Sequence, residues 1–263
     1  MLLLSAHDDA GGAGLDPALD LALAHALVRR AGAGDLSGAV RVSRPAAPVV
    51  VFGRRDVRHA RFAAAADAAR AAGFEPLVRA VGGLPVAYTR AAVVVDHVGT
   101  GERPGDGIER RFADFGDLYA RALRRLGVAA QVGPVPGEYC PGAHSVNARG
   151  QVKLVGTAQR VVRDAWLFSA LVVVDDADRV RAVLGDVYRL LDLPFDARSV
   201  GALADEAPGT DVEAVRDAVL AVCGERDPLV PAPLDDATLA LARTLAAQHR
   251  VTVGAVPGPR SPG

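Results

Sequence analysis

The chain has 263 residues, half of them hydrophobic, and a formal net charge of −1 at pH 7. This length suits one large domain, and the near-neutral charge argues against a generic surface for nucleic acid or anionic membranes. The first residues carry no basic segment and soon turn acidic, and no apolar run reaches membrane-spanning length, so we expect neither a signal peptide nor a membrane span. Two distant cysteines do not form a disulfide framework, and the sequence therefore predicts a cytoplasmic protein.

The first half of the chain alternates predicted helices with short predicted strands. Asp16 is a good N-cap for a leucine-rich helix over 17–30, and an alanine-rich helix later ends at Gly73. Short apolar runs predict the strands, which are 39–42, 49–52, 77–80 and 85–95. The last two of these strands flank a pair of glycines.

The second half of the chain begins with apolar residues at helical spacing over 108–126, where Gly127 ends the predicted helix. A proline- and glycine-rich loop over 133–142 follows, and β-branched residues then predict strands between 152 and 174. Helical spacing returns in the remaining segments, which are 177–191, 212–223 and 236–249. Because helices and strands are mixed along the chain, the sequence predicts an α/β or α+β fold with a mixed β-sheet and flanking helices.

Cys140 has proline and glycine on both sides, within the loop over 133–142. A thiol on a rigid loop reacts as a nucleophile when a nearby cation stabilises its thiolate, and an inert loop thiol is the alternative interpretation. Cys223 lies among apolar residues of a predicted helix, which is typical of a small buried hydrophobic residue. His97 and His144 are the histidines nearest these motifs, and His144 is a candidate base for Cys140. The histidines and cysteines show no metal-ligand spacing.

Lys153 is the only lysine among 30 basic residues. Arginine replaces lysine readily on a surface, but it cannot replace a compact ammonium in a site that needs one, so this lysine is a candidate functional residue. Its survival by chance is the alternative. Lys153, Val155 and Thr157 share one face of the predicted strand, where a buried ammonium is costly unless it has a partner or a role. Gly156 indicates a close approach by a ligand or another strand.

Gly82 and Gly83 lie between two predicted strands. A double glycine lets backbone amides approach a substrate closely, and a simple turn is the alternative interpretation.

Together these segments resemble the biotin/lipoate protein ligase superfamily. Members carry an Arg-x-x-Gly-Gly-like motif on a strand and turn, and a Lys-x-x-Gly-x-Ala-Gln-Arg-like strand with the catalytic lysine. The matching residues are Arg79, Gly82 and Gly83 for the first motif, and Lys153, Gly156, Ala158, Gln159 and Arg160 for the second. The resemblance spans roughly residues 16–191. It implies a class II biotin/lipoate ligase-like catalytic domain over residues 1–200, a short helical extension of that domain over 201–255 and a disordered tail over 256–263.

Two departures favour a transferase within this superfamily. Lipoate ligases, which activate lipoate with ATP, usually have a third glycine and a histidine-containing strand, whereas here Leu84 follows the two glycines and no histidine comes next. The Cys140 loop resembles that of cysteine-dependent octanoyltransferases, which pass octanoyl from the glycine-cleavage H protein to lipoyl domains of 2-oxoacid dehydrogenases. A related class takes octanoyl from acyl carrier protein, and both donors stay open.

The resemblance implies catalysis by Cys140 and Lys153 without a cofactor or metal. The Cys140 thiolate would form an acyl thioester that the acceptor lysine attacks, while the Lys153 ammonium would favour the thiolate and offset the oxyanion. The residues implied in substrate binding are Arg79, Gly82, Gly83, Leu84, Gly156, Thr157, Ala158 and Gln159. We expect the sulfur and the ammonium to face one pocket near the glycines, and neither residue to belong to the core.

Two other functions compete with octanoyl or lipoyl transfer. One is an ATP-dependent lipoate–protein ligase in which Cys140 is incidental. The other is a non-catalytic lipoyl- or acyl-binding protein. The expected partners are the acyl-donor carrier and lipoyl-domain acceptor proteins, with no nucleic acid and no membrane.

Overall fold

The computed structural model describes residues 1–5, 15–101 and 103–252. The tail over 256–263, for which the sequence predicts disorder, lies outside these residues.

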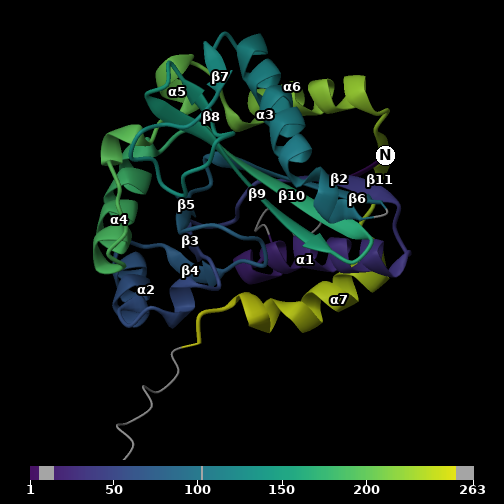
Figure 1. The fold of residues 1–263 in the computed structure, drawn as a ribbon, viewed down its shortest axis with the longest axis horizontal. Helices are drawn as coiled ribbons and strands as arrows, with labels where there is room; N and C mark the ends of the chain where they lie inside the picture. Colours follow the sequence, from purple (N-terminus) through teal and green to yellow (C-terminus); the bar gives the residue numbers. More distant parts are fainter. Residues whose placement is uncertain (6–14, 102, 253–263) are drawn as a thin grey trace, which may run out of the picture.

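Two β-sheets form the centre of the described structure (Figure 1). The larger sheet has eight strands in the order β11-β1-β2-β6-β10-β9-β8-β7. Their bounds are β1 Leu2–Ser5, β2 Gly38–Ser43, β6 Ala92–Thr100, β7 Ala130–Val132, β8 Val146–Ala148, β9 Val152–Val162, β10 Ala165–Val173 and β11 Val230–Ala232. Strand β1 runs parallel to β2 and β11, and the other neighbours are antiparallel. The smaller sheet has the order β4-β3-β5, with bounds Glu75–Val78, Val49–Phe52 and Val86–Tyr88.

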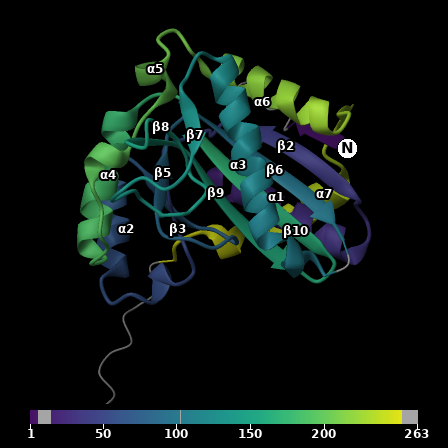
Figure 2. The same ribbon diagram turned by 45° about the horizontal axis from the view of Figure 1, so that its top comes forward.

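Helices cover both faces of the larger sheet. Helix α1 (Pro17–Ala33) lies on one face against β6 and β10, and α7 (Asp236–Ala246) packs on α1. Helix α3 (Ile108–Arg125) crosses the opposite face, where α6 (Val212–Arg226) packs beside it (Figure 2). Helices α2 (Phe62–Ala71) and α4 (Ala177–Leu190) pack together beside the smaller sheet, and α5 (Leu203–Glu206) is a single turn. No helix in the described part of the chain is long and apolar enough to cross a membrane.

The mixed fold with flanking helices is confirmed. Helix α1 begins where expected because the Asp16 side chain accepts a hydrogen bond from the Leu19 amide, and Gly34 ends it in the left-handed conformation. The prediction of one strand over 85–95 is wrong, since the segment divides into β5 and β6, which belong to different sheets. The strand predicted over 77–80 lies earlier in the chain, as β4.

The strands that the sequence did not predict are short ones, namely β1, β7, β8 and β11. Each has three or four residues, too few for a clear alternation of apolar and polar side chains. Strand β11 pairs with β1, so the segment after residue 200 adds a strand to the large sheet as well as helices.

Candidate active site

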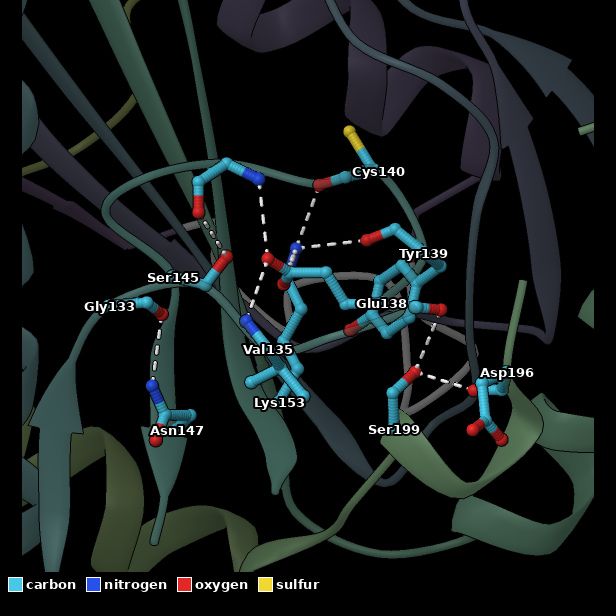
Figure 3. Close-up of polar contacts among 12 residues, drawn as sticks. Gly133, Val135, Glu138, Tyr139, Cys140, Ser145, Asn147, Lys153, Asp196 and Ser199 are labelled. Atoms are coloured by element: carbon cyan, nitrogen blue, oxygen red, sulfur yellow. Dashed lines mark hydrogen bonds and ion pairs between the residues drawn. The ribbon is translucent and has the colours of Figure 1, made fainter. Parts of the chain in front are cut away.

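Cys140 lies in the loop between β7 and β8, above a buried ion pair between Glu138 and Lys153 (Figure 3). Glu138 Oε2 lies 2.9 Å from Lys153 Nζ, and both side chains are almost completely enclosed. Glu138 Oε1 accepts hydrogen bonds from the amides of Val135 (3.2 Å) and Gly142 (3.3 Å). One carboxylate therefore ties both ends of the cysteine loop to the lysine on β9.

The Lys153 ammonium also binds the backbone of the loop itself. It donates hydrogen bonds to the carbonyl oxygens of Tyr139 (3.0 Å) and Cys140 (2.9 Å), and Glu138 completes its surroundings as an ion pair. An ammonium carries three donors around one compact charge, whereas a guanidinium is a wide planar fork. This arrangement explains why a lysine stands here in a chain otherwise rich in arginine. The prediction that Lys153 lies outside the core is wrong, because its side chain is only 2% exposed.

The backbone of Cys140 is held in an unusual conformation. Its φ angle of 41° lies in the left-handed region, which a non-glycine residue adopts at a cost of about 1–3 kcal/mol. The Cys140 amide donates to the Tyr188 hydroxyl (2.7 Å), and that hydroxyl donates to the carbonyl of Pro85 (2.9 Å). Burial raises the pKa of Tyr188, so the phenol stays protonated and can bridge the loop to the segment before β5.

Arg79 is the cation that contacts the sulfur. Its Nη2 lies 3.5 Å from Cys140 Sγ and donates to the carbonyl of Leu84 at 2.6 Å. The sulfur points away from the Lys153 ammonium, which binds the carbonyl groups on the other side of the loop (Figure 3). A cation in contact with the sulfur can balance negative charge that develops there during a reaction, so the geometry suits a nucleophilic cysteine.

Gly83 makes this contact between Arg79 and Cys140 possible. Its φ is +111°, and a Cβ added there would lie 2.5 Å from Arg79 Nη2 and 2.7 Å from Cys140 Sγ. A Cβ on the neighbouring Gly82 would meet nothing within 4 Å. The two glycines of the motif therefore differ, and only the second is needed for the packing of arginine and cysteine.

A cavity opens beside Cys140 and extends between α1 and the large sheet, with the small sheet forming another wall. The empty space measures about 750 Å³, open solvent at its mouth included. Apolar side chains form much of its wall, namely Leu21, Ala24, Val51, Val86, Val94, Leu167 and Leu171. Such a site suits a flexible apolar chain attached to the sulfur. Lys153 does not line this cavity.

One part of the cavity wall is polar, and we call it the polar wall: Asp20, Arg41, Tyr88, Asp96 and Ser169. Arg41 donates from Nη1 to Asp96 (2.8 Å) and from Nη2 to Asp20, and Ser169 donates to Asp96 (2.6 Å). Burial raises the pKa of Asp96 while Arg41 opposes that rise. Burial opposes the charge of Arg41, but Asp20 and Asp96 together raise its pKa. Arg41 therefore remains a cation inside the protein, with two carboxyl groups as its partners.

The residues predicted to bind substrate fall into three groups. Arg79, Gly156, Thr157 and Ala158 line the cavity together with Cys140. Gly82, Gly83 and Leu84 lie next to Arg79, outside the residues that form the cavity wall. Gln159 faces α3, where its amide donates to Ile108 O (3.0 Å) and accepts from Arg111 (3.0 Å). Its contacts anchor the start of that helix.

The two candidate histidines lie outside the cavity wall. His144 Nε2 is 3.6 Å from the Glu109 carboxylate, and its ring stacks on Phe112. His97 lies 2.8 Å from the Tyr119 hydroxyl, where burial lowers its pKa to about 3. Neither histidine forms a hydrogen bond with Cys140, and each has another partner.

Glu138, Tyr188 and the polar wall were not predicted from the sequence. Glu138 is two residues before the cysteine, and a lysine buried in an apolar strand calls for a carboxylate partner. Arg41 and Asp96 each interrupt a run of valines, which is the signal of a buried charged pair. Their pairing across 55 residues is a property of the strand register.

His25 lines another part of the cavity and is paired with a second buried histidine, His249. His249 Nδ1 lies 2.8 Å from the carbonyl of Val78, and its Nε2 lies 3.3 Å from His25 Nδ1. A neutral tautomer in which His249 donates to Val78 and accepts from His25 satisfies both contacts. Burial, followed by the nearby His249, lowers the pKa of His25 to about 4. Within residues 1–5, 15–101 and 103–252 no three or more metal-binding side chains are grouped as a metal site would require.

Residues 16–223 match the model of the lipoyl protein ligase A/B catalytic domain family. An octanoyl-[GcvH]:protein N-octanoyltransferase of Exiguobacterium sibiricum is 30% identical over 135 residues, which are 51% of this chain and 49% of that protein. One of Bacillus velezensis is 27% identical over 112 residues, 43% of this chain and 39% of that protein. The chain thus matches at most about half the length of these relatives.

Solved structures share the fold at low sequence identity. A lipoate-protein ligase A bound with ATP has a TM-score of 0.72 and 20% identity, covering 94% of this chain and 93% of that one. A bipartite lipoate protein ligase from Thermoplasma acidophilum has a TM-score of 0.68 and 18% identity, covering 94% and 91%.

Proposed function

Since the chain belongs to the lipoyl protein ligase A/B catalytic domain family, we propose that it transfers an octanoyl or lipoyl group onto the lysine of a lipoyl domain through a thioester on Cys140. The observation that carries this proposal is the position of Cys140, whose sulfur contacts Arg79 at the edge of a cavity suited to an acyl chain. The names of the two relatives support the same reaction class and suggest the glycine-cleavage H protein as donor. Acyl carrier protein is the alternative donor.

The first step forms the acyl-enzyme. The Cys140 thiolate attacks the donor carbonyl, a carbon–sulfur bond forms, and the bond to the donor nitrogen or sulfur breaks as that atom takes up a proton. Arg79 balances the charge of the thiolate before the attack. Burial of the acyl chain along the apolar wall, in a cavity that opens at Cys140, would hold the carbonyl near the sulfur.

The second step transfers the acyl group to the acceptor. The neutral amine of the acceptor lysine attacks the thioester, the carbon–sulfur bond breaks, the thiolate returns and the nitrogen loses a proton. In this proposal Lys153 acts as a positioning residue, since it holds the carbonyls of Tyr139 and Cys140. A contact between Lys153 and the oxyanion, which the family resemblance implies, requires the ammonium to release one of these oxygens.

Transfer without nucleotide tests this function against the ligase. Purified protein is incubated with octanoyl-loaded H protein or octanoyl-loaded acyl carrier protein and a lipoyl-domain acceptor, and acceptor mass is followed with and without ATP. We expect acylation without ATP from at least one carrier. Acylation only from free lipoate or octanoate with ATP would favour the ligase, and no acylation under any condition would favour a binding protein.

A further inference from the structure

Polar residues form a row across the strands beneath the cavity. Ala158 on β9 pairs with Ser169 on β10, Ser169 pairs with Asp96 on β6, and Asp96 pairs with Arg41 on β2. Since neighbouring strands lie about 4.8 Å apart, Asp96 is roughly 10 Å from β9 along this row. The cavity therefore has a small-residue end at Ala158 and a charged end at Asp96 and Arg41.

An acyl chain bound to Cys140 would begin at the end of the cavity where Arg79 and Gly156 lie. An extended eight-carbon acyl group measures about 9 Å from its carbonyl carbon to its last carbon. A chain that crosses β9 and β10 would thus bring its far end to the polar wall. A plain methyl group there would displace water from buried charges without replacing its hydrogen bonds, which is unfavourable.

Two atoms of the polar wall are free to bind a ligand. The Tyr88 hydroxyl and the second carboxylate oxygen of Asp20 have no hydrogen-bond partner among the residues that the structure describes. Neither atom is fully enclosed by protein. Both residues line the cavity. Burial raises the pKa of Tyr88, with Asp20 and Asp96 adding to the rise, so its hydroxyl remains a donor and acceptor.

The charges of the polar wall decide which kind of group fits. Asp20 and Asp96 both pair with Arg41, so the wall has no spare cation for a carboxylate at the end of the chain. A neutral donor such as a hydroxyl or thiol can donate to Asp20 and accept from Tyr88. If the ion pairs of the polar wall served only to attach α1 to the sheet, the Tyr88 hydroxyl would have no role.

We propose that the cavity selects an acyl group that carries a hydroxyl or thiol near its eighth carbon over an unsubstituted octanoyl group. This inference rests on the proposed function, because it assumes that the acyl chain enters from Cys140. It names Tyr88 and Asp20 as the specificity-determining residues and Arg41 as the residue that positions Asp20.

The test compares the binding of octanamide and 8-hydroxyoctanamide by isothermal titration calorimetry, with nonanamide as a control for length. We expect the hydroxylated amide to bind about 10-fold more tightly than octanamide, as one hydrogen bond to a charged partner provides. Tyr88→Phe should reduce this ratio at least about threefold. Tyr119→Phe, which removes a hydroxyl from the opposite face of the sheet, should leave the ratio unchanged.

Three outcomes would overturn the inference: octanamide binds as tightly as the hydroxylated amide, none of the amides binds, or Tyr88→Phe leaves the ratio as it is. Binding of the amides needs no chemistry at Cys140, so a failure of this binding test is distinct from a failure of the proposed function. Preferential binding without any acyl-enzyme would contradict the transfer reaction alone. An acyl-enzyme together with tighter binding of octanamide would contradict this inference alone.

Discussion

The cysteine loop and the polar wall are each held by a buried cation, Lys153 and Arg41 respectively, but the two cations bind different groups. Lys153 binds two backbone carbonyls and one carboxylate, whereas Arg41 binds the carboxylates of Asp20 and Asp96. A compact ammonium suits converging oxygens on a tight loop, and a planar fork suits two carboxylates on neighbouring elements. The comparison indicates that the single lysine fits the geometry of the cysteine loop, and that charge alone does not explain its presence there.

Among substitutions that leave Cys140 in place, Lys153→Arg should have the largest effect. A guanidinium keeps the charge but is too wide for the space between Glu138 and the two carbonyls, so it should displace the Cys140 loop. A shift of about 1 Å in a reacting group costs on the order of 10² in rate, and we expect at least this loss in kcat/KM for acyl transfer. Arg163→Lys, at a position 94% exposed, is the matched control and should be neutral. Near wild-type activity in Lys153→Arg would show that the ammonium geometry does not matter.

Gly83→Ala should have the next largest effect on activity. The added Cβ meets Arg79 and Cys140 at 2.5 and 2.7 Å, so the contact between them must open. We expect a loss of about 10- to 100-fold in transfer rate with circular dichroism unchanged. Gly82→Ala meets nothing within 4 Å and should retain activity. Equal behaviour of the two variants would contradict the distinction between the glycines.

Arg41→Lys separates the polar wall from the cysteine loop. The lysine keeps the charge but cannot bind two carboxylates as a fork, and we expect the free energy of unfolding to fall by about 1–3 kcal/mol. In Arg41→Lys, iodoacetamide should alkylate Cys140 at the wild-type rate. Lys153→Arg should change both the free energy of unfolding and the rate of alkylation. A change in alkylation rate in Arg41→Lys would mean that the two regions are coupled.

The last effect, confined to acid pH, concerns the His25–His249 pair. The pKa of His25 is about 4 in the folded protein and about 6.5 in an unfolded chain, so the unfolded state binds the proton first as pH falls. The contribution of neutral His25 to the free energy of unfolding is therefore fully present above pH 6.5. It is lost progressively toward pH 4, by about 1–3 kcal/mol. Urea unfolding between pH 7 and pH 4.5 should show this slope in the wild type and a weaker one in His25→Gln. An equal slope in both would exclude His25 as the source.

Local sequence signals singled out Cys140 and Lys153, and the family resemblance singled out Arg79. The structure places all three close together, since Arg79 contacts the Cys140 sulfur and Lys153 donates to the Cys140 carbonyl. The direction of the Lys153 side chain could not be predicted, since it depends on Glu138, which lies in a loop with no periodic pattern. The Arg41–Asp96 pair depends on the register of β2 against β6, which no local signal fixes.

The fold, too, was predicted where local sequence signals are strong and missed where tertiary contacts decide the structure. Helix α1 has a cap, a left-handed C-terminus and helical spacing, and its position was predicted closely. The separation of β5 from β6 was missed because Thr89, Arg90 and Ala91 contain neither glycine nor proline. The turn depends on tertiary contacts there, in which Arg90 donates to Ala46 O and Arg44 donates to Arg90 O.

Intact-mass spectrometry of the protein after incubation with an octanoyl-loaded carrier, without nucleotide, tests the central claim most directly. The account predicts one octanoyl adduct, labile to hydroxylamine, that peptide mapping assigns to Cys140. Cys223→Ala should carry the same adduct, because Cys223 is buried and burial raises its thiol pKa to about 12. Cys140→Ala should carry none and should lose transfer. Full transfer by Cys140→Ala, or an adduct that maps elsewhere, would contradict the assignment of Cys140 as the nucleophile.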